Sequence, residues 1–364
     1  MLHLMAWALK ALGLPLRLIP LKNRVAFLSR QSKVLSLDYR LAIDELKKSL
    51  PPNQVAVCVS DPESKDPVGF VLNTIKHLYY GLTSKVVIVD GYIPAVSIPK
   101  QRKGATIIQL WHALGAIKKF GYQCLDTPAG RTNKQARVGR MHKNYDWIIA
   151  GSSGAVEEFA EAFGYPQNNV LPLGLPRTDY LLSPDLAPLR SHHARAAVER
   201  LPFLDNDRKI LLYAPTLRKG EGYAESWLTD YVQNLAQSVD PGAILLVAGH
   251  PLNNNASKKL LEEFPSVRFS NGIPTIDLIA FADEVITDYS AIAFEAALLG
   301  KHVSFYAPDI ERYKLSPGLN LDVRHLDNEA LNAYIGENRE GALERLTELI
   351  LSCLKTSTAR KQQN

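Results

Sequence analysis

Short apolar runs alternate with longer stretches of helical periodicity along most of the chain. This alternation is typical of parallel β-sheets whose strands are joined by crossover helices. In the first half it predicts strands at Arg24–Ser29, Val55–Ser60, Lys85–Asp90, Thr106–Trp111, Trp147–Gly151 and Val170–Gly174. Helices are expected between them at Tyr39–Leu50, Val68–Tyr80 and Gly154–Phe163.

The second half repeats the pattern after a turn that contains Gly174 and Pro176. It predicts strands at Lys209–Ala214, Ile244–Ala248, Val267–Phe269, Glu284–Ile286 and His302–Tyr306, and helices at Glu225–Gln237, Asn255–Phe264, Thr275–Phe281 and Ala291–Leu299. A final helix is expected over Glu329–Leu354 and is expected to pack on the first domain. The predicted fold class is therefore α/β, with doubly wound Rossmann-like domains at 23–175 and 176–328 and a C-terminal helix and tail at 329–364.

Residues 1–22 carry a different pattern, a leucine-rich stretch interrupted by Lys10 and Arg17. A secretory signal would keep its apolar centre free of charge, so a signal peptide is not expected. No run of about 18 uncharged apolar residues is present, which argues against a transmembrane span. Two interpretations remain. The segment is either an amphipathic element in the membrane interface, with Trp7 at headgroup depth and the basic residues on anionic lipid, or a helix packed on the protein body.

The composition narrows the class of protein. The 364 residues are 46% hydrophobic and 22% charged, as expected for a folded protein of two domains. The net charge of +5 fits an anionic partner without choosing among nucleotide, phosphate and lipid headgroup. Cys58, Cys124 and Cys353 form no CxxC pair, so neither a disulfide framework nor a zinc site is expected. The absence of P-loop, GxGxxG and HExxH motifs argues against NTPases, typical NAD enzymes and zincins.

Two histidines follow predicted strands directly. Doubly wound domains bind ligands at the carboxyl ends of their strands, so residues in these positions are candidates for chemistry. His112 follows Thr106–Trp111 and is expected to open a short helix ending near Lys118, whereas His250 follows Ile244–Ala248 and is kept extended by the next residue, Pro251. Each imidazole is placed to take a proton from a substrate hydroxyl, and a structural histidine is the alternative for each.

Other polar residues after strands suit a phosphate. Arg218 follows Lys209–Ala214 and suits a two-pronged grip on a phosphate, with a surface arginine as the alternative. At Ser290 a strand meets the start of an Ala-rich helix, where free N–H groups and the helix dipole favour an anion; alternatively Ser290 only caps its helix. Arg177 and Asp179, in the turn between the domains, are candidates for an interdomain or substrate contact, and we favour their bracing each other.

Five basic residues recur at every third position: Arg131, Lys134, Arg137, Arg140 and Lys143. On a helix this spacing drifts around the axis, so these side chains would cover a broad face rather than a seam. They are interpreted either as a solvated helix face or as a basic surface for an anionic membrane or a diphosphate-linked lipid.

Several short motifs occur together in a fixed order. They are Gln109–His112, Gly151–Ser153, Gly174–Asp179, Tyr213–Arg218, His250–Pro251, Ile286–Ser290 and Tyr306–Asp309. As an ordered set over roughly residues 85–315, they resemble the CDP-glycerol glycerophosphotransferase family of teichoic acid synthesis. Two departures are Ala113, where the family usually has glycine, and Ala291, where it often has a second serine.

The resemblance implies a GT-B architecture, with two domains facing a central cleft and CDP-glycerol held mainly by the second. It implies that the catalytic histidines are His112 and His250, that the donor-phosphate arginine is Arg218, and that the strand-to-helix phosphate site is Thr287, Asp288 and Ser290. No cofactor or protein metal site is expected, and stimulation by a divalent ion stays open. No nucleic-acid partner is expected.

Length and the N-terminal segment resemble the primases of the family, because no room is left for the extra N-terminal domain of long polymerases. A primase transfers the first glycerol phosphate to an undecaprenyl-diphosphate-linked disaccharide, with release of CMP, as a peripheral protein on the cytoplasmic face of the bacterial membrane. The alternatives are a glycerol- or ribitol-phosphate polymerase of the family, a GT-B transferase that uses a UDP-sugar, and a non-enzymatic scaffold or nucleotide sensor.

Overall fold

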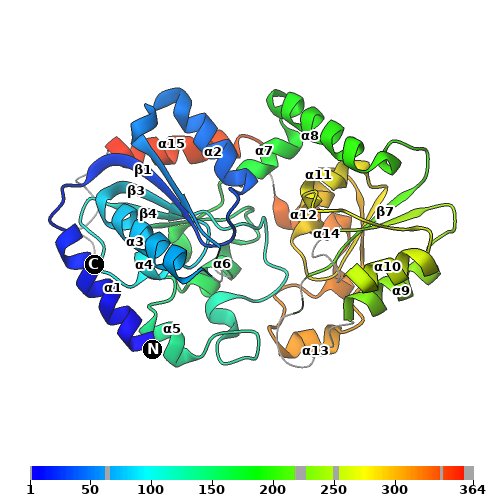
Figure 1. The fold of residues 1–364 in the computed structure, drawn as a ribbon, viewed down its shortest axis with the longest axis horizontal. Coiled ribbons are helices and arrows are strands. Elements are labelled where there is room, and N and C mark those ends of the chain that lie inside the picture. Colours follow the sequence, from blue (N-terminus) through cyan, green and yellow to red (C-terminus); the bar gives the residue numbers. More distant parts are fainter. Residues whose placement is uncertain are drawn as a thin grey trace. The chain divides into compact units, whose positions relative to one another are not determined.

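The computed structural model describes residues 2–61, 66–216, 218, 227–248, 254–336 and 339–355. The chain divides into two compact units (Figure 1). Unit 1 comprises Met1–Leu114, Phe120–Asp179 and Asn338–Asn364, and unit 2 comprises Gly115–Lys119 and Tyr180–Glu337. Each unit holds one parallel sheet, so the predicted α/β class is confirmed.

The sheet of unit 1 has six parallel strands in the order β2-β1-β3-β4-β5-β6. Their bounds are β1 Lys22–Ser29, β2 Val55–Val59, β3 Ser84–Val89, β4 Thr106–Gln109, β5 Trp147–Ile149 and β6 Val170–Leu171. β1 and β3 pair in register from Val25 opposite Val86 to Leu28 opposite Val89, and these residues are completely buried. Continuous burial explains why the strands are recognisable as unbroken apolar runs.

The helices of unit 1 are α1 Leu2–Leu16, α2 Leu37–Ser49, α3 Pro67–Thr83, α4 Pro94–Ser97, α5 Asn133–Val138, α6 Val156–Phe163 and α15 Ala342–Lys355. The side chains of Ser36 and Asp66 accept hydrogen bonds at the starts of α2 and α3, which fixes where those helices begin. α15 packs on α2, β1 and β3 (Figure 1), so the predicted return of the C-terminal helix to the first domain is confirmed. α7, at Pro176–Leu182, contains the residue where unit 1 gives way to unit 2.

α1 packs on α3 through one face, formed by Ala6, Leu9 and Gly13. A methyl group on Gly13 would lie 3.1 Å from Leu82 Cδ1, which shows how closely the two helices approach. The interpretation of a helix packed on the protein body is therefore confirmed. The rest of the helix surface exposes Trp7, Leu4, Leu12 and Leu14, and the insertion of these side chains into a membrane stays a prediction. Within the described ranges, no helix has both the length and the apolar character needed to cross a membrane.

The sheet of unit 2 has five parallel strands in the order β11-β10-β7-β8-β9. Their bounds are β7 Ile210–Ala214, β8 Ile244–Val247, β9 Val267–Phe269, β10 Glu284–Thr287 and β11 His302–Phe305. Its helices are α8 Ala187–Arg200, α9 Trp227–Ser238, α10 Asn254–Glu263, α11 Thr275–Leu278, α12 Ile292–Leu298, α13 Ile310–Leu315 and α14 Asn328–Ile335. The strand interiors and α9 share one core that includes Tyr213, Val232 and Leu245.

Short 3-10 turns complete the chain at Pro52–Gln54, Gly121–Cys124, Gln167–Asn169, Pro184–Leu186, Pro202–Leu204, Ile279–Phe281 and Val323–His325.

Three of the helix predictions are wrong. The segment after His112 forms no helix; instead Lys118 pairs with Leu319 in an isolated antiparallel bridge. The basic stretch is helical only in α5, because the backbone then turns through positive φ at Arg140, His142 and Asn144. The predicted single C-terminal helix is two helices, α14 in unit 2 and α15 in unit 1, because the chain adopts positive φ at Gly336 and Gly341.

Candidate functional site

In unit 1, the loop after β4 is tied to the loop after β3 at the carboxyl edge of the sheet. Leu110 N donates to Val89 O at 2.7 Å and so extends the β3–β4 pairing by one residue. The Gln109 side chain accepts from Trp111 N at 3.1 Å and donates to Gly91 O at 3.3 Å. The position of His112 is therefore set by two neighbouring strands.

Trp111 has a positive φ of 56°, which is rare for a bulky side chain. Its ring lies against His112, with centroids 4.1 Å apart, and stacks on Phe120 at 4.8 Å. The edge of Phe163 contacts the same ring at 5.2 Å. Such strained conformations persist only where the surrounding packing holds them, and they are concentrated at functional sites.

His112 is held in one tautomer by the backbone of Asp90. The Nδ1 atom lies 3.0 Å from Asp90 O. A carbonyl oxygen only accepts hydrogen bonds, so Nδ1 carries the proton in the neutral ring, and the lone pair is on Nε2. This is the protonation state that a general base requires.

Two other histidines of unit 1, His77 and His142, are buried and have structural roles, in contrast to His112. The ring of His142 packs against Phe163 in the protein interior, and burial lowers the pKa of His142 to about 3. His77 is also buried, and its pKa is lowered to about 4. Both rings stay neutral at physiological pH, whereas His112 is exposed to solvent.

Asp90 is a candidate residue that the sequence analysis did not identify. Asp90 is only 3% exposed, and its Oδ1 atom has no hydrogen-bond partner within the described structure. Burial raises the pKa of this carboxyl to about 7; a hydrogen bond from Ser29 opposes the shift, and nearby Asp38 adds to it. The only signal in the sequence was an aspartate at the end of an apolar strand, and such residues are common.

Gly151, at the end of β5, leaves room for the segment that follows His112. A methyl group added at Gly151 would lie 2.4 Å from Leu114 Cα and 2.7 Å from Leu114 O, closer than such atoms can approach. The next residue, Ser152, is buried. The glycine of the motif Gly151–Ser153 is therefore needed for the close passage of the His112 loop over the sheet.

Arg177 and Asp179 do not brace each other. Arg177 is paired with Asp38, through its backbone N at 2.8 Å, Nε at 2.9 Å and Nη2 at 2.5 Å. Asp179 accepts from Gly341 N and Leu343 N, both at 2.6 Å, at the start of α15. The expected mutual bracing is wrong, because each residue connects α7 to a different helix of unit 1. Their contact with a substrate or across domains stays a prediction.

In unit 2, Thr287 and Asp288 join the loops that follow β7 and β10. Thr287 Oγ1 donates to Ala214 O at 2.7 Å. Asp288 Oδ1 accepts from Thr216 N at 2.8 Å and from Tyr289 N at 2.5 Å. Both side chains are completely buried and are engaged within the protein.

Arg218 is buried beside Asp288, and its side chain is 0% exposed. Nη1 donates to Asp288 Oδ2 at 2.7 Å and to Thr216 O at 2.8 Å. Nε and Nη2 donate to the two oxygens of Asp309, at 2.8 and 3.0 Å. Burial alone would lower the pKa of Arg218, but Asp288 and Asp309 together raise it above its usual value. The surface-arginine interpretation is therefore wrong, and the direct grip on a phosphate stays a prediction.

Asp309, the last residue of the motif Tyr306–Asp309, is a further partner of Arg218. Besides the two bonds from Arg218, it accepts a hydrogen bond from Tyr289 Oη at 3.0 Å. Tyr289 in turn stacks on Tyr313, with centroids 3.7 Å apart, and both rings lie against the Arg218 guanidinium. The arginine is thus fixed by two carboxylates and by aromatic faces.

Ser290 differs from these residues because it is only half-buried. Its Oγ lies 3.4 Å from Ile292 N, so it caps α12 only weakly. Further along α12, Phe294 packs on the segment that follows His112. A methyl group on Gly115 would lie 2.5 Å from Phe294 Cε2 and 2.6 Å from Tyr334 Cε1. Gly115 therefore belongs to the core that supports α12.

His250 lies outside the described residues. Within the described ranges, no group of three histidine, cysteine, aspartate or glutamate side chains is arranged to hold a metal ion.

Residues 14–349 match the family described as CDP-Glycerol:Poly(glycerophosphate) glycerophosphotransferase. The chain belongs to this family. Similar proteins include the teichoic acid ribitol-phosphate primase of Bacillus spizizenii, 32% identical over 307 residues, which covers 81% of this chain and 76% of that protein. They also include the teichoic acid glycerol-phosphate primase of Bacillus subtilis, 30% identical over 258 residues, which covers 71% and 63% of the two chains. The family and these relatives support the role of a teichoic acid transferase.

Two solved structures have the same fold as this glycerophosphotransferase family member. One is a variant of the wall teichoic acid polymerase TagF soaked with CDPG, with a TM-score of 0.67, 20% identity and coverage of 92% of this chain and 90% of that chain. The other is the UDP-GlcNAc 2-epimerase from Neisseria meningitidis, with a TM-score of 0.58, 16% identity and coverage of 90% and 100%. These likenesses confirm the predicted GT-B-type fold.

Proposed function

We propose that the protein transfers glycerol phosphate from CDP-glycerol to a sugar hydroxyl of a polyprenyl-diphosphate-linked disaccharide, with release of CMP, and so primes wall teichoic acid synthesis. Family membership and the two primases at 30 to 32% identity support this proposal. The single observation that carries the chemistry is the bond from His112 Nδ1 to Asp90 O, which leaves the lone pair on Nε2.

The reaction is an in-line displacement. The acceptor hydroxyl oxygen forms a bond to the β-phosphorus of CDP-glycerol, and the bond from that phosphorus to the bridging oxygen breaks. CMP leaves with the bridging oxygen, and the hydroxyl proton goes to His112 Nε2. General-base assistance of this kind is worth roughly 10²–10⁴-fold in rate. His250 is assigned to neutralising charge on the diphosphate.

The donor phosphates are assigned to Ser290 and the N–H groups at the start of α12. Ser290 is half-buried and reaches solvent, whereas the side chains of Arg218, Thr287 and Asp288 are buried and bonded internally. We therefore assign these three residues the role of fixing the loop that presents Ser290. Preorganised donors of this kind are worth a few kcal/mol when charge develops at a phosphate.

The membrane contact is assigned to α1 and to the basic side chains near it. Trp7 is 67% exposed on the face of α1 that points away from α3. Lys10, Arg131, Lys134 and Arg137 are exposed as well, and Arg17 is half-buried. Exposed aromatic and basic residues together favour peripheral attachment to an anionic bilayer, here the cytoplasmic face of the cell membrane.

The test supplies one nucleotide donor at a time, with and without a lipid-linked disaccharide. We expect CMP release only when CDP-glycerol and the acceptor are both present, and one glycerol phosphate per product molecule by mass spectrometry. Long chains of glycerol phosphate would indicate a polymerase instead. Nucleotide release only from a UDP-sugar would refute polyol-phosphate transfer.

A second candidate is transfer of ribitol phosphate from CDP-ribitol. It is favoured by the match to the ribitol-phosphate primase, which covers 76% of that protein. The same assay separates the two donors, because each gives a product of different mass.

A further inference from the structure

A cavity of about 580 Å³ lies in unit 1 at the edge of the sheet opposite to His112. Among its lining residues, Ala105 directly precedes β4 and Asp146 directly precedes β5. His112 follows β4, and the strands are parallel, so the two places lie at opposite ends of the same strands. The cavity is therefore separate from the candidate reaction centre.

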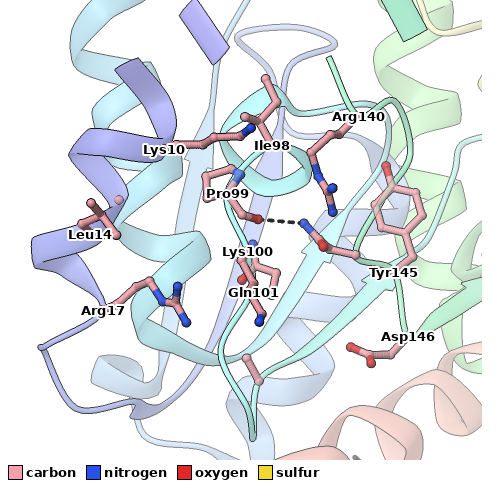
Figure 2. Close-up of a pocket in the computed structure, with 13 residues that line it drawn as sticks. Lys10, Leu14, Arg17, Ile98, Pro99, Lys100, Gln101, Arg140, Tyr145 and Asp146 are labelled. Carbon is pink, nitrogen blue, oxygen red and sulfur yellow. Dashed lines mark hydrogen bonds between the residues drawn. The ribbon is translucent and has the colours of Figure 1, made fainter. Parts of the chain in front are cut away.

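The cavity is lined by four cationic side chains and one carboxylate. Lys10 on α1 and Arg17 directly after this helix extend toward the segment of Pro99 and Gln101, and Arg140 lies on the facing wall (Figure 2). The fourth cation is Lys100. In the described part of the chain, neither Lys10 nor Arg17 nor Lys100 pairs with a carboxylate. The excess positive charge favours an anionic ligand.

The lone carboxylate of the lining is engaged by the backbone. Asp146 Oδ2 accepts a hydrogen bond from Ile107 N at 2.8 Å, which orients it toward β4. It therefore has a structural role in the loop and leaves most of the cationic charge uncompensated.

Gln101 adds an unused hydrogen-bond acceptor to the lining. The residue is 9% exposed, and its Nε2 donates to Val96 O at 2.8 Å. Because a carbonyl oxygen only accepts, this bond fixes which end of the amide is the nitrogen. Oε1 then has no partner within the described structure, although it is buried. A ligand that carries a hydroxyl beside its anionic group would satisfy it.

The wall of the cavity is held in place by Asn144. This residue has a positive φ of 78°, and its Nδ2 donates to Val96 O, Ser97 O and Pro99 O at 2.9 to 3.0 Å. The bond to Pro99 is the dashed line in Figure 2. The cavity is thus formed by the fold itself, which lowers the cost of ordering on binding.

The rim of the cavity is apolar on the side of α1. Leu14 lines the cavity and is nevertheless 64% exposed. On a helical wheel, Leu4, Trp7 and Leu14 share one exposed face of α1, and Lys10 falls between that face and the one packed on α3. An anion site beside this exposed apolar face of α1 suits an amphiphile.

We propose that this cavity binds the phosphodiester headgroup of an anionic lipid that carries a headgroup hydroxyl, such as phosphatidylglycerol. The phosphate lies among Lys10, Arg17 and Arg140, the headgroup hydroxyl donates to Gln101 Oε1, and the acyl chains follow the exposed face of α1. The site goes beyond the proposed transfer reaction, because it lies at the other end of the strands and needs no nucleotide donor.

The first experiment uses the unmodified full chain and vesicles of phosphatidylcholine with equal fractions of either phosphatidylglycerol or phosphatidylmethanol. The two anionic lipids carry the same charge, but only the first has a headgroup hydroxyl. We expect severalfold tighter co-sedimentation with phosphatidylglycerol. Equal binding to both would overturn the assignment of the hydroxyl to Gln101.

The second experiment compares two double variants that remove the same charge. Arg17→Gln with Arg140→Gln changes the cavity, whereas Lys47→Gln with Lys48→Gln changes exposed lysines at the end of α2. Each headgroup contact by a basic residue is worth about fivefold in membrane affinity. We expect the cavity variant to lose about 25-fold, and the control little. Equal losses would mean that only overall charge matters and would overturn the site.

Soluble competitors separate the lipid from a free polyol phosphate. Glycerol phosphate at concentrations that leave the vesicles intact should displace little of the bound protein, because it lacks the acyl chains. Tight binding of glycerol phosphate, with no binding to phosphatidylglycerol vesicles, would overturn the lipid assignment. The vesicle assay contains no CDP-glycerol, so CMP release with a short-chain soluble acceptor tests the proposed function independently of it.

Discussion

His112 Nδ1 lies 3.0 Å from the backbone carbonyl oxygen of Asp90. The bond joins the loops after β3 and β4 and makes Nε2 the basic atom of the ring. The same residue that fixes the tautomer carries a buried carboxyl whose pKa is raised to about 7 by desolvation. A base and a carboxyl with a pKa near neutral thus belong to neighbouring loops at one edge of the sheet.

His112→Ala should lower the turnover number for CMP release by roughly 10²-fold or more, because the acceptor proton loses its base. The affinity for CDP-glycerol, measured by calorimetry without acceptor, should stay close to that of the unmodified protein. His302→Ala is the matched control, since His302 is an exposed histidine on β11. Turnover that is equally normal in both variants would remove His112 from the mechanism.

Asp90→Asn should change how stability depends on pH. The folded-state pKa of Asp90 is about 7, above the value near 3.9 expected in the unfolded chain, so the folded state binds the proton more tightly. Ionisation of Asp90 therefore destabilises the fold progressively as pH rises from about 4 to 7.

The variant lacks this penalty. The difference in the free energy of unfolding, variant minus unmodified protein, should become more positive by a few kcal/mol as the pH rises from 5 to 8. Urea titrations at both pH values measure the difference, and Asp44→Asn, at an exposed site on α2, serves as the control. A difference between Asp90→Asn and the unmodified protein that does not vary with pH would contradict the raised pKa.

Arg218→Ala should lower the free energy of unfolding by about 3–5 kcal/mol, because it leaves Asp288 and Asp309 buried without their cation. The apparent KM for CDP-glycerol should rise in the same variant, since the loop that presents Ser290 loses its support. Arg195→Ala, on the exposed face of α8, should change neither quantity. A variant with unchanged stability and weakened donor binding would show that Arg218 acts directly on the ligand.

Gly151→Ala should displace the His112 loop, because the added methyl group would lie 2.4 Å from Leu114 Cα. Overpacking of this kind costs roughly 1–3 kcal/mol, and the turnover number should fall more than donor affinity does. Gly242→Ala is the control, since its nearest neighbour would be a flexible carboxylate at 3.2 Å. Unchanged turnover in Gly151→Ala would mean that the loop tolerates a shift of several tenths of an ångström.

Trp7→Ser combined with Leu18→Ser should weaken binding to anionic vesicles without altering the fold, because both side chains are largely exposed. Turnover with a short-chain soluble acceptor should be retained. The paired change Val34→Ser and Leu315→Ser removes two exposed apolar residues elsewhere and should leave vesicle binding intact. Equal vesicle binding by all three proteins would refute attachment through α1.

The strands could be predicted from the sequence because parallel sheets bury both faces, so β1 and β3 are continuous apolar runs. The partners of Arg218 could not be predicted, since Asp288 and Asp309 lie 70 and 91 residues further along the chain. Asp90 was missed because burial, and not its position in the sequence, makes its carboxyl unusual. The break between α14 and α15 could have been predicted, because Gly336 and Gly341 are both glycines suited to ending a helix.

The short excursion at Gly115–Lys119 limits how this protein can be divided. Lys119 N donates to Gly318 O and Asn320 N donates to Ile117 O, so these residues complete the packing of unit 2 although they are encoded within unit 1. A fragment that begins at Tyr180 would lack them. Recombination at a single point in the gene would therefore separate unit 2 from a peptide that packs on it. Exchange of the two units between relatives should succeed only when residues 115–119 are exchanged together with unit 2.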